Sequence, residues 1–143
     1  MEGLSRLYDE TVLDHGRRPR NRGSLAGATH RGEAESPLCG DQLAVALEID
    51  GGVIRRVRFD GAACAIAVAS ASLMTEAVAE RTLEQTRTLA LQVRALCRAE
   101  HGDAAGETAL GALAALVGVR RYPVRVQCAL LAWDALDRAL AAG

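Results

Sequence analysis

The stretch QLAVALEIDGGVIRRVRF, residues 42–59, is the part of the sequence that most clearly predicts the fold. Its first half places a large hydrophobic residue at every second position, as a strand does when it buries one face. These hydrophobic positions are Leu43, Val45, Leu47 and Ile49. Asp50, Gly51 and Gly52 then predict a turn, and residues 53–59 alternate again with arginines interspersed. The stretch therefore predicts a β-hairpin.

On both sides of this hairpin the hydrophobic period changes to that of a helix. We expect helices over residues 3–15, 66–79, 83–100, 107–117 and 124–140. Residues 16–38 are rich in Arg and Gly and lack any period, so a loop is expected there, and shorter connections are expected at 102–106 and 118–123. The predicted class is α+β, a small antiparallel sheet covered by helices, in a single domain over residues 1–143.

The composition excludes several classes of function. Aromatic residues make up 3% of the chain and the net charge is −1, so neither base stacking nor an overall basic field favours nucleic acid. All 17 basic residues are arginine, which excludes a lysine Schiff base with pyridoxal phosphate.

A membrane location is not expected either. The first 15 residues are amphipathic rather than signal-like, and the longest apolar stretch, residues 62–74, is too short to span a bilayer. We therefore expect a soluble cytoplasmic protein. Four cysteines in such a chain favour metal or redox chemistry over structural disulfides.

The motif Cys39-Gly40-Asp41 precedes the first predicted strand. In an extended backbone, side chains two positions apart point the same way. If Ile49 faces the first residue of the second strand, counting back puts Asp41 opposite Gly61, so that Cys64 returns to the level of Cys39 and Asp41. Three potential ligands are thus expected at one end of the hairpin.

Cys128 and Arg125 are two further candidates for this site. Cys64 lies just before one predicted helix and Cys128 in the first turns of the last helix, and a helix N-terminus favours the thiolate form. Arg125 lies three residues before Cys128 on the same helical face, where a guanidinium would offset negative charge. Sequence spacing alone does not bring Cys128 to the other cysteines.

Three thiolates and one carboxylate suit tetrahedral zinc, and they could also hold a small iron–sulfur cluster. The alternative is that the cysteines are ordinary small buried residues. Cys97 lies on the apolar side of its helix and is expected in the core.

Other polar residues carry weaker signals. His15 ends the first helix, where a cation would be favourable. His101 is expected to be solvated, and His30 has no assigned role. The basic stretch formed by Arg17, Arg18, Arg20 and Arg22 predicts either a solvated loop or a docking surface for an acidic partner.

Several of these motifs together resemble the NifU/IscU/SufU family of iron–sulfur cluster assembly proteins. The matching stretches are residues 7–15, 19–23, 37–41, 64–66, 69–75 and 128–133. The resemblance covers nearly the whole chain and implies a sheet of about three strands packed against helices. It also implies that Cys39, Asp41, Cys64 and Cys128 surround one metal or cluster.

The branch that the chain resembles most is SufU. Scaffold members usually carry His before the last Cys, where this chain has Gln127, and Cys64 and Cys128 are farther apart here than in scaffolds. This likeness implies a zinc-dependent sulfurtransferase in which Cys39 accepts sulfur as a persulfide from a SufS-like cysteine desulfurase. A SufBCD-like cluster-building complex would then receive the sulfur.

Two alternatives stay open: a scaffold that binds iron or a transient [2Fe–2S] cluster and transfers it to apo-proteins, and a domain in which zinc only holds the fold. The segment Tyr122-Pro123-Val124-Arg125 lacks the double proline and Lys that chaperones recognise in scaffold members, so an Hsp70-type partner is not expected.

Overall fold

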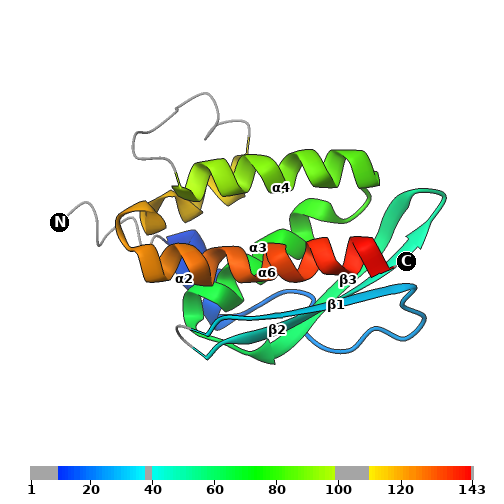
Figure 1. Ribbon diagram of the computed structural model, residues 1–143, viewed down its shortest axis with the longest axis horizontal. Helices are drawn as coiled ribbons and strands as arrows, with labels where there is room; N and C mark the ends of the chain where they lie inside the picture. Colours follow the sequence, from blue (N-terminus) through cyan, green and yellow to red (C-terminus); the bar gives the residue numbers. More distant parts are fainter. Residues whose placement is uncertain (1–9, 38–39, 99–109, 143) are drawn as a thin grey trace.

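The computed structural model describes residues 10–37, 40–98 and 110–142 (Figure 1). Along the chain the elements are α2 (Glu10–Arg17), β1 (His30–Glu35), β2 (Gln42–Asp50), β3 (Val53–Ala62), α3 (Ala65–Val78), α4 (Leu83–Arg98), the 3₁₀ helix η1 (Gly111–Arg121) and α6 (Pro123–Ala142). The predicted α+β class is confirmed.

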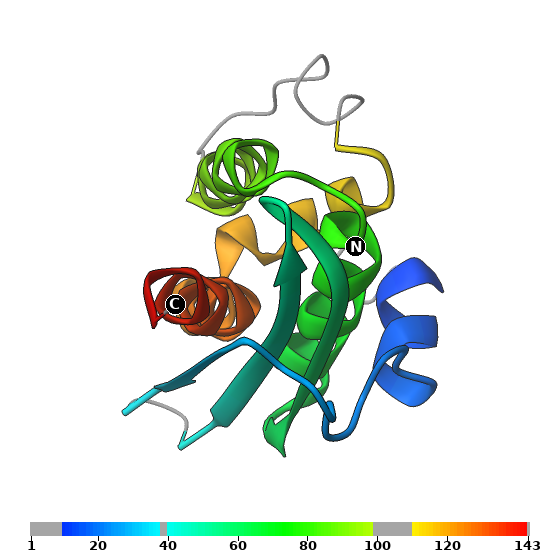
Figure 2. The same ribbon diagram turned by 90° about the vertical axis from the view of Figure 1, so that its right-hand side faces the viewer.

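The three strands form one antiparallel sheet in the order β1-β2-β3. Helix α6 packs on β1 and β2, while α3 packs on β3 and α6. Figure 2 shows α3 between α6 and α2, with α4 above α6 and beside the turn of the β2–β3 hairpin, whose Gly52 carbonyl accepts a hydrogen bond from Leu83. The larger hydrophobic residues Leu43, Val45 and Leu47 are buried at every second position of β2, on one face of the sheet, and Ala46 between them is buried as well.

The β2–β3 hairpin is confirmed, but its predicted register is wrong by two residues. Val53 pairs with Asp50, and a bulge between Glu48 and Ile49, close to the turn, adds a further shift. Leu43 consequently lies opposite Gly61, where Asp41 had been predicted. From Gln42 to Glu48 the shift is two positions, which leaves these side chains on their predicted face, because successive side chains alternate. The start of β2 therefore lies closer to the end of β3 than the simple count implied.

The sheet of three strands agrees with the family resemblance, but the place of strand β1 was not predicted, since residues 16–38 were expected to form a loop. Its sequence, HRGEAE, has no large hydrophobic residue. The reason is the close approach of α6: a Cβ atom on Gly32 would lie 2.3 Å from the backbone nitrogen of Ala139. Only small residues fit on this face, so the usual strand signal is missing.

Within the described residues the helices agree with the sequence except at two places, and residues 3–9 of the first predicted helix and the predicted connection 102–106 lie outside that part of the chain. Helix α2 continues through Gly16, where a break had been expected. The helix predicted over 107–117 is, from Gly111 on, the 3₁₀ helix η1, which continues to Arg121 where a connection over 118–123 had been predicted; residues 107–109 lie outside the described residues. His101 and the predicted end of the helix at residues 99–100 lie outside the described residues. Within the described part of the chain, no helix has both the length and the apolar character that crossing a membrane requires.

Hydrogen bonds join α3 to α6 in the core. Ser70 Oγ donates to the carbonyl oxygen of Ala129 and accepts a bond of 3.2 Å from the indole nitrogen of Trp133. All three residues are fully buried. Buried polar groups of this kind need partners, so the pair fixes how the two helices face each other. Cys128 is thereby held next to a fixed backbone position.

The expectation of a cation at His15 is wrong. The side chain is buried, and its Nδ1 lies 2.7 Å from Ser72 Oγ, which also accepts a hydrogen bond from the backbone of Arg20. Burial lowers the pKa of His15 below its ordinary 6.5, and the charge of Arg20 lowers it further, whereas Glu76 and Asp14 act in the opposite direction. The neutral imidazole is therefore favoured in the folded protein.

This lowered pKa predicts that acid destabilises the fold. Below pH 6.5 the unfolded chain takes up a proton at His15 before the folded chain does, so the free energy of unfolding falls as the pH drops toward the folded pKa. The control variant His15→Gln keeps a hydrogen-bonding side chain but cannot titrate. Urea unfolding at pH 7.5 and pH 5 should show a smaller loss for this variant than for the wild type; equal losses would contradict the role given to His15.

Candidate metal centre

Three of the four predicted ligands meet in the structure. An oxygen of Asp41 and the sulfurs of Cys64 and Cys128 all lie within 4.8 Å of one another. Asp41 directly precedes β2, Cys64 directly precedes α3, and Cys128 lies near the start of α6. Asp41 and Cys128 are buried, and Cys64 is half-buried. Cys39, the fourth predicted ligand, lies outside the described residues.

A bulged turn holds Asp41 in position. The backbone N–H of Ser36 donates to the carbonyl oxygen of Asp41 at 2.8 Å, and the N–H of Gly40 donates to the carbonyl oxygen of Ser36 at 2.8 Å. Gly40 has φ +71°, a left-handed conformation that glycine adopts without strain. Two residues thus oppose one, as in a β-bulge that begins with glycine. The motif Cys-Gly-Asp needs its glycine for this reason.

Cys64 reaches the site as the N-cap residue of α3. Its backbone is extended, with φ −68° and ψ 166°, and its side chain makes no capping hydrogen bond. Its carbonyl oxygen accepts the first helical bond, from Val68, at 3.0 Å. The sulfur therefore lies at the positive end of a helix, where negative charge is favoured.

Cys128 faces the interior from α6 and is 0% exposed. The packing of α3 on α6, fixed at Ser70 and Ala129, is what brings this sulfur to Cys64. Arg125 is half-buried one turn earlier on α6. Its role beside the site stays a prediction.

The donor set fits a metal ion. Asp41 Oδ2 is buried and has no hydrogen-bond partner among the described residues. A buried carboxylate oxygen without a partner is costly, and a cation supplies what it lacks. Two sulfurs with one carboxylate suit zinc, and the same donors can also serve an iron–sulfur cluster. The described donors thus define a metal centre without choosing between these occupants.

Cys97 does not belong to this triad. It is 0% exposed on α4, and burial raises the pKa of its thiol to about 12. A thiol held in its protonated form is a poor nucleophile and a poor metal ligand. The prediction that Cys97 is a core residue is confirmed.

The basic stretch before β1 is largely paired within the protein. Arg18 and Arg20 both bind the Asp14 carboxylate, at 2.7 and 2.6 Å, and these bonds lower the pKa of Asp14. Arg22 donates to the carbonyl oxygen of Gly61 at 2.8 Å. This pairing favours a structural role over a free docking surface.

Sequence reasoning passed over Ser36. Its hydroxyl oxygen is buried and, like Asp41 Oδ2, has no partner within the described residues. A serine directly after the last strand residue carries no periodic signal, so only the observed pairing across the turn draws attention to it.

Comparison with known proteins places the chain among relatives with a common role. Residues 7–142 match the model of the NifU-like N-terminal domain. The chain is 32% identical to the zinc-dependent sulfurtransferase SufU of Bacillus subtilis, over 96% of this chain and 92% of that protein. It is 34% identical to the iron–sulfur cluster assembly scaffold protein IscU of Thermotoga maritima, over 94% of this chain and 92% of that protein.

A solved structure shows the same likeness. FiSufU of Fervidobacterium islandicum, named for a role as an iron–sulfur cluster assembly scaffold protein of the SUF system, superposes with a TM-score of 0.85. It is 29% identical, and the match covers 95% of this chain and 98% of that one. The two branches named by these relatives, zinc-dependent sulfurtransferase and cluster scaffold, are about equally close in sequence.

Proposed function

Because the chain belongs to the NifU-like N-terminal domain family of iron–sulfur cluster assembly proteins, we propose that it is a zinc-bound sulfur carrier. Zinc would be held by Cys39, Asp41, Cys64 and Cys128. Cys39 would accept sulfur from a cysteine desulfurase and pass it to a cluster-building complex. The observation that carries this proposal is the convergence of Asp41, Cys64 and Cys128 within 4.8 Å.

Two features support zinc over a cluster. The residue before Cys128 is Gln127, where scaffold members usually carry His, and Cys64 and Cys128 are farther apart here than in scaffold members. Three thiolates and one carboxylate around a divalent cation carry a net charge of about −2. Arg125, one turn before Cys128, is the residue that we propose offsets part of this charge.

In the transfer step, the Cys39 thiolate attacks the terminal sulfur of a persulfide on the donor enzyme. A sulfur–sulfur bond forms on Cys39 as the donor's sulfur–sulfur bond breaks, and the donor leaves as a thiolate, so no external oxidant is needed. Bound zinc would keep the cysteines as thiolates at neutral pH. Gly40, next to Cys39, is exposed, which suits approach by a second protein.

The second candidate function is that of a scaffold for a transient [2Fe–2S] cluster. It is favoured by the 34% identity to the scaffold protein of T. maritima and by a donor set that a cluster could also use. A purely structural zinc site is less compatible with the geometry, because Cys64 is half-buried and one ligand is a carboxylate, whereas structural sites are closed and use Cys or His.

Anaerobic purification separates the two functions. One zinc per chain in a colourless sample supports the sulfur carrier. A brown sample that contains iron and sulfide in equal amounts supports the scaffold and contradicts the zinc proposal.

The variant Cys39→Ala tests the sulfur acceptor. We expect it to lose nearly all stimulation of a cysteine desulfurase, measured as alanine formed from cysteine in the presence of a reductant, because no thiol remains to take the sulfur. Cys97→Ala is the control and should stimulate as the wild type does, since Cys97 is buried on α4. Full stimulation by Cys39→Ala would rule out the assigned role.

A further inference from the structure

Among the residues that the structure describes, two buried oxygens beside the metal centre have no hydrogen-bond partner. Among the buried side-chain nitrogens and oxygens of the described residues, those with no hydrogen-bond partner are Ser36 Oγ and Asp41 Oδ2. Ser36 is 5% exposed and Asp41 is 7% exposed. Most buried polar atoms in folded proteins have partners, so each such atom calls for an explanation. Because both oxygens lie on the same turn, one explanation can account for both.

Ser36 and Asp41 are direct neighbours across this turn. The ladder between β1 and β2 ends with Glu35 opposite Gln42, and the next rung is the bond from the Ser36 N–H to the Asp41 carbonyl oxygen. Residues that oppose each other in an antiparallel pair point to the same face, with Cβ atoms about 4.5–5.5 Å apart. The two side chains therefore share the buried face that carries the ligands.

The chemistry of the pair allows one kind of bond. A serine hydroxyl can donate one proton, and an ionised carboxylate can only accept. A carboxylate that gives one oxygen to a metal leaves the other for a second partner, and such outer partners fix how the ligand is oriented. Ser36 Oγ turns about a single bond with three staggered positions, so it can reach this role without moving the backbone.

We propose that Ser36 is a positioning residue for the metal centre. Its hydroxyl donates a hydrogen bond to one oxygen of the Asp41 carboxylate, and so holds the other oxygen, Oδ2, toward the metal beside Cys64 and Cys128. This inference rests on the proposed function, because it requires a metal at the triad.

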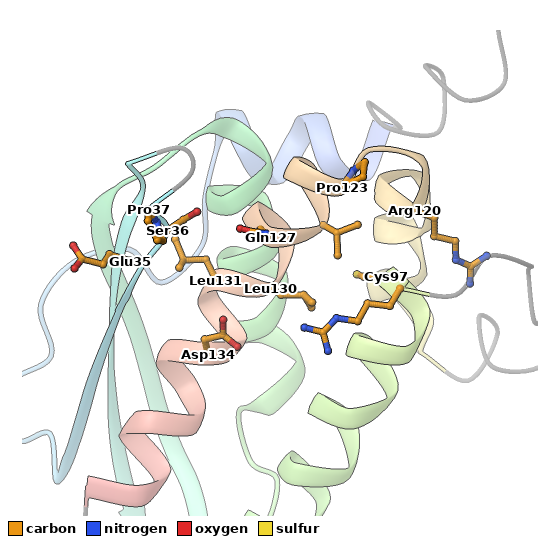
Figure 3. A pocket seen from close by; sticks show the side chains of 12 residues that line it. Glu35, Ser36, Pro37, Cys97, Arg120, Pro123, Gln127, Leu130, Leu131 and Asp134 are labelled. Atoms are coloured by element: carbon orange, nitrogen blue, oxygen red, sulfur yellow. The ribbon is translucent and has the colours of Figure 1, made fainter.

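A second possible partner for the hydroxyl lies on its other side. Ser36 lines a cavity of about 540 Å³ between the end of β1 and α6. Figure 3 shows Ser36 and Pro37 on the sheet side of this cavity and Gln127 and Leu131 on the helix side. A hydroxyl that served only a water molecule in this cavity would have no influence on metal affinity, so the two roles can be separated by experiment.

The test compares Ser36→Ala with Ser36→Thr, which keeps the hydroxyl, and with Ser24→Ala, which changes an exposed serine in a loop. Zinc affinity is measured by competition with a chromophoric chelator, and coordination geometry by the visible spectrum of the cobalt-substituted protein. We expect Ser36→Ala to weaken zinc binding about tenfold and to change the cobalt spectrum. Ser36→Thr and Ser24→Ala should both retain the wild-type affinity and spectrum.

The metal-free stability distinguishes positioning from a structural role. Removing a buried hydroxyl that has no partner should leave the Tm of the metal-free protein unchanged or slightly raised. A lowered metal-free Tm for Ser36→Ala, with zinc binding weakened equally in Ser36→Thr, would show a structural role and overturn the proposal. Unchanged zinc affinity in Ser36→Ala would overturn it as well. A wild-type protein that binds no zinc would instead overturn the proposed function, and this inference with it.

Discussion

Replacing Gly32 with alanine is expected to destabilise the protein by about 3 kcal/mol or more, a large part of the roughly 5–15 kcal/mol that holds a domain folded. The added Cβ would lie 2.3 Å from the backbone nitrogen of Ala139 and 2.5 Å from the carbonyl oxygen of Ala135. Both atoms belong to the backbone of α6, which cannot move aside as a flexible side chain can. Relief requires α6 to move away from β1.

Urea unfolding of the metal-free protein measures this effect, and Gly16→Ala is the matched control. Gly16 lies in α2, where an added Cβ would be 3.4 Å from the nearest atom, the carbonyl oxygen of Ala65. The control should be neutral or more stable by about 0.5–1 kcal/mol, because alanine is the better helix former. A loss below about 1 kcal/mol for Gly32→Ala would mean that the contact between β1 and α6 is looser than described.

The variant Cys128→Ala is expected to weaken zinc binding by more than about a hundredfold, beyond the 10–100-fold that loss of an outer partner causes. Cys128 supplies one of the two described sulfurs of the triad and is fully buried. No neighbouring side chain among the described donors replaces it, because the triad consists of Asp41, Cys64 and Cys128 alone within the part of the chain that the structure describes. Chelator competition gives the dissociation constant, and the sulfur-to-cobalt absorption of the cobalt form gives an independent measure.

Cys97→Ala is the control for this loss. Cys97 and Cys128 are both 0% exposed on helices, so each substitution removes one buried sulfur and leaves a similar cavity. Only the change at Cys128 should affect the metal. If Cys128→Ala kept zinc within about threefold of the wild type, Cys128 would not be a ligand, since a lost first ligand cannot cost less than a lost outer partner.

Helix α6 links these two predictions, because it packs on Gly32 and carries Cys128. Helix α6 contributes Cys128 to the triad and packs its opposite end on Gly32. A displacement of α6 by Gly32→Ala should therefore also reduce metal binding, although Gly32 is not near the ligands in sequence. Zinc stoichiometry of the folded fraction is the measurement that would show this coupling.

Local patterns in the sequence determined much of the fold. The two-residue period of 42–59 predicted the hairpin, and the helical period predicted α3, α4 and α6 to within a few residues. The same reasoning brought Asp41 and Cys64 to one end of the hairpin, although the count was off by two. These features follow from the sequence because periodicity reports which face of an element is buried.

Tertiary structure alone decided the rest. Strand β1 lacks the alternating large hydrophobic residues of a typical strand. The reason is that the backbone of α6 lies too close to Gly32 for a larger side chain to fit there. Cys128 lies beside Cys64 only because α3 packs on α6. The role proposed for Ser36 depends on its position opposite Asp41 across the turn. A sequence pattern shows that a face is buried, but what it packs against depends on residues far away in the chain. Such a long-range contact, the packing of α3 on α6, brings Cys128 to Asp41 and Cys64 as the third ligand.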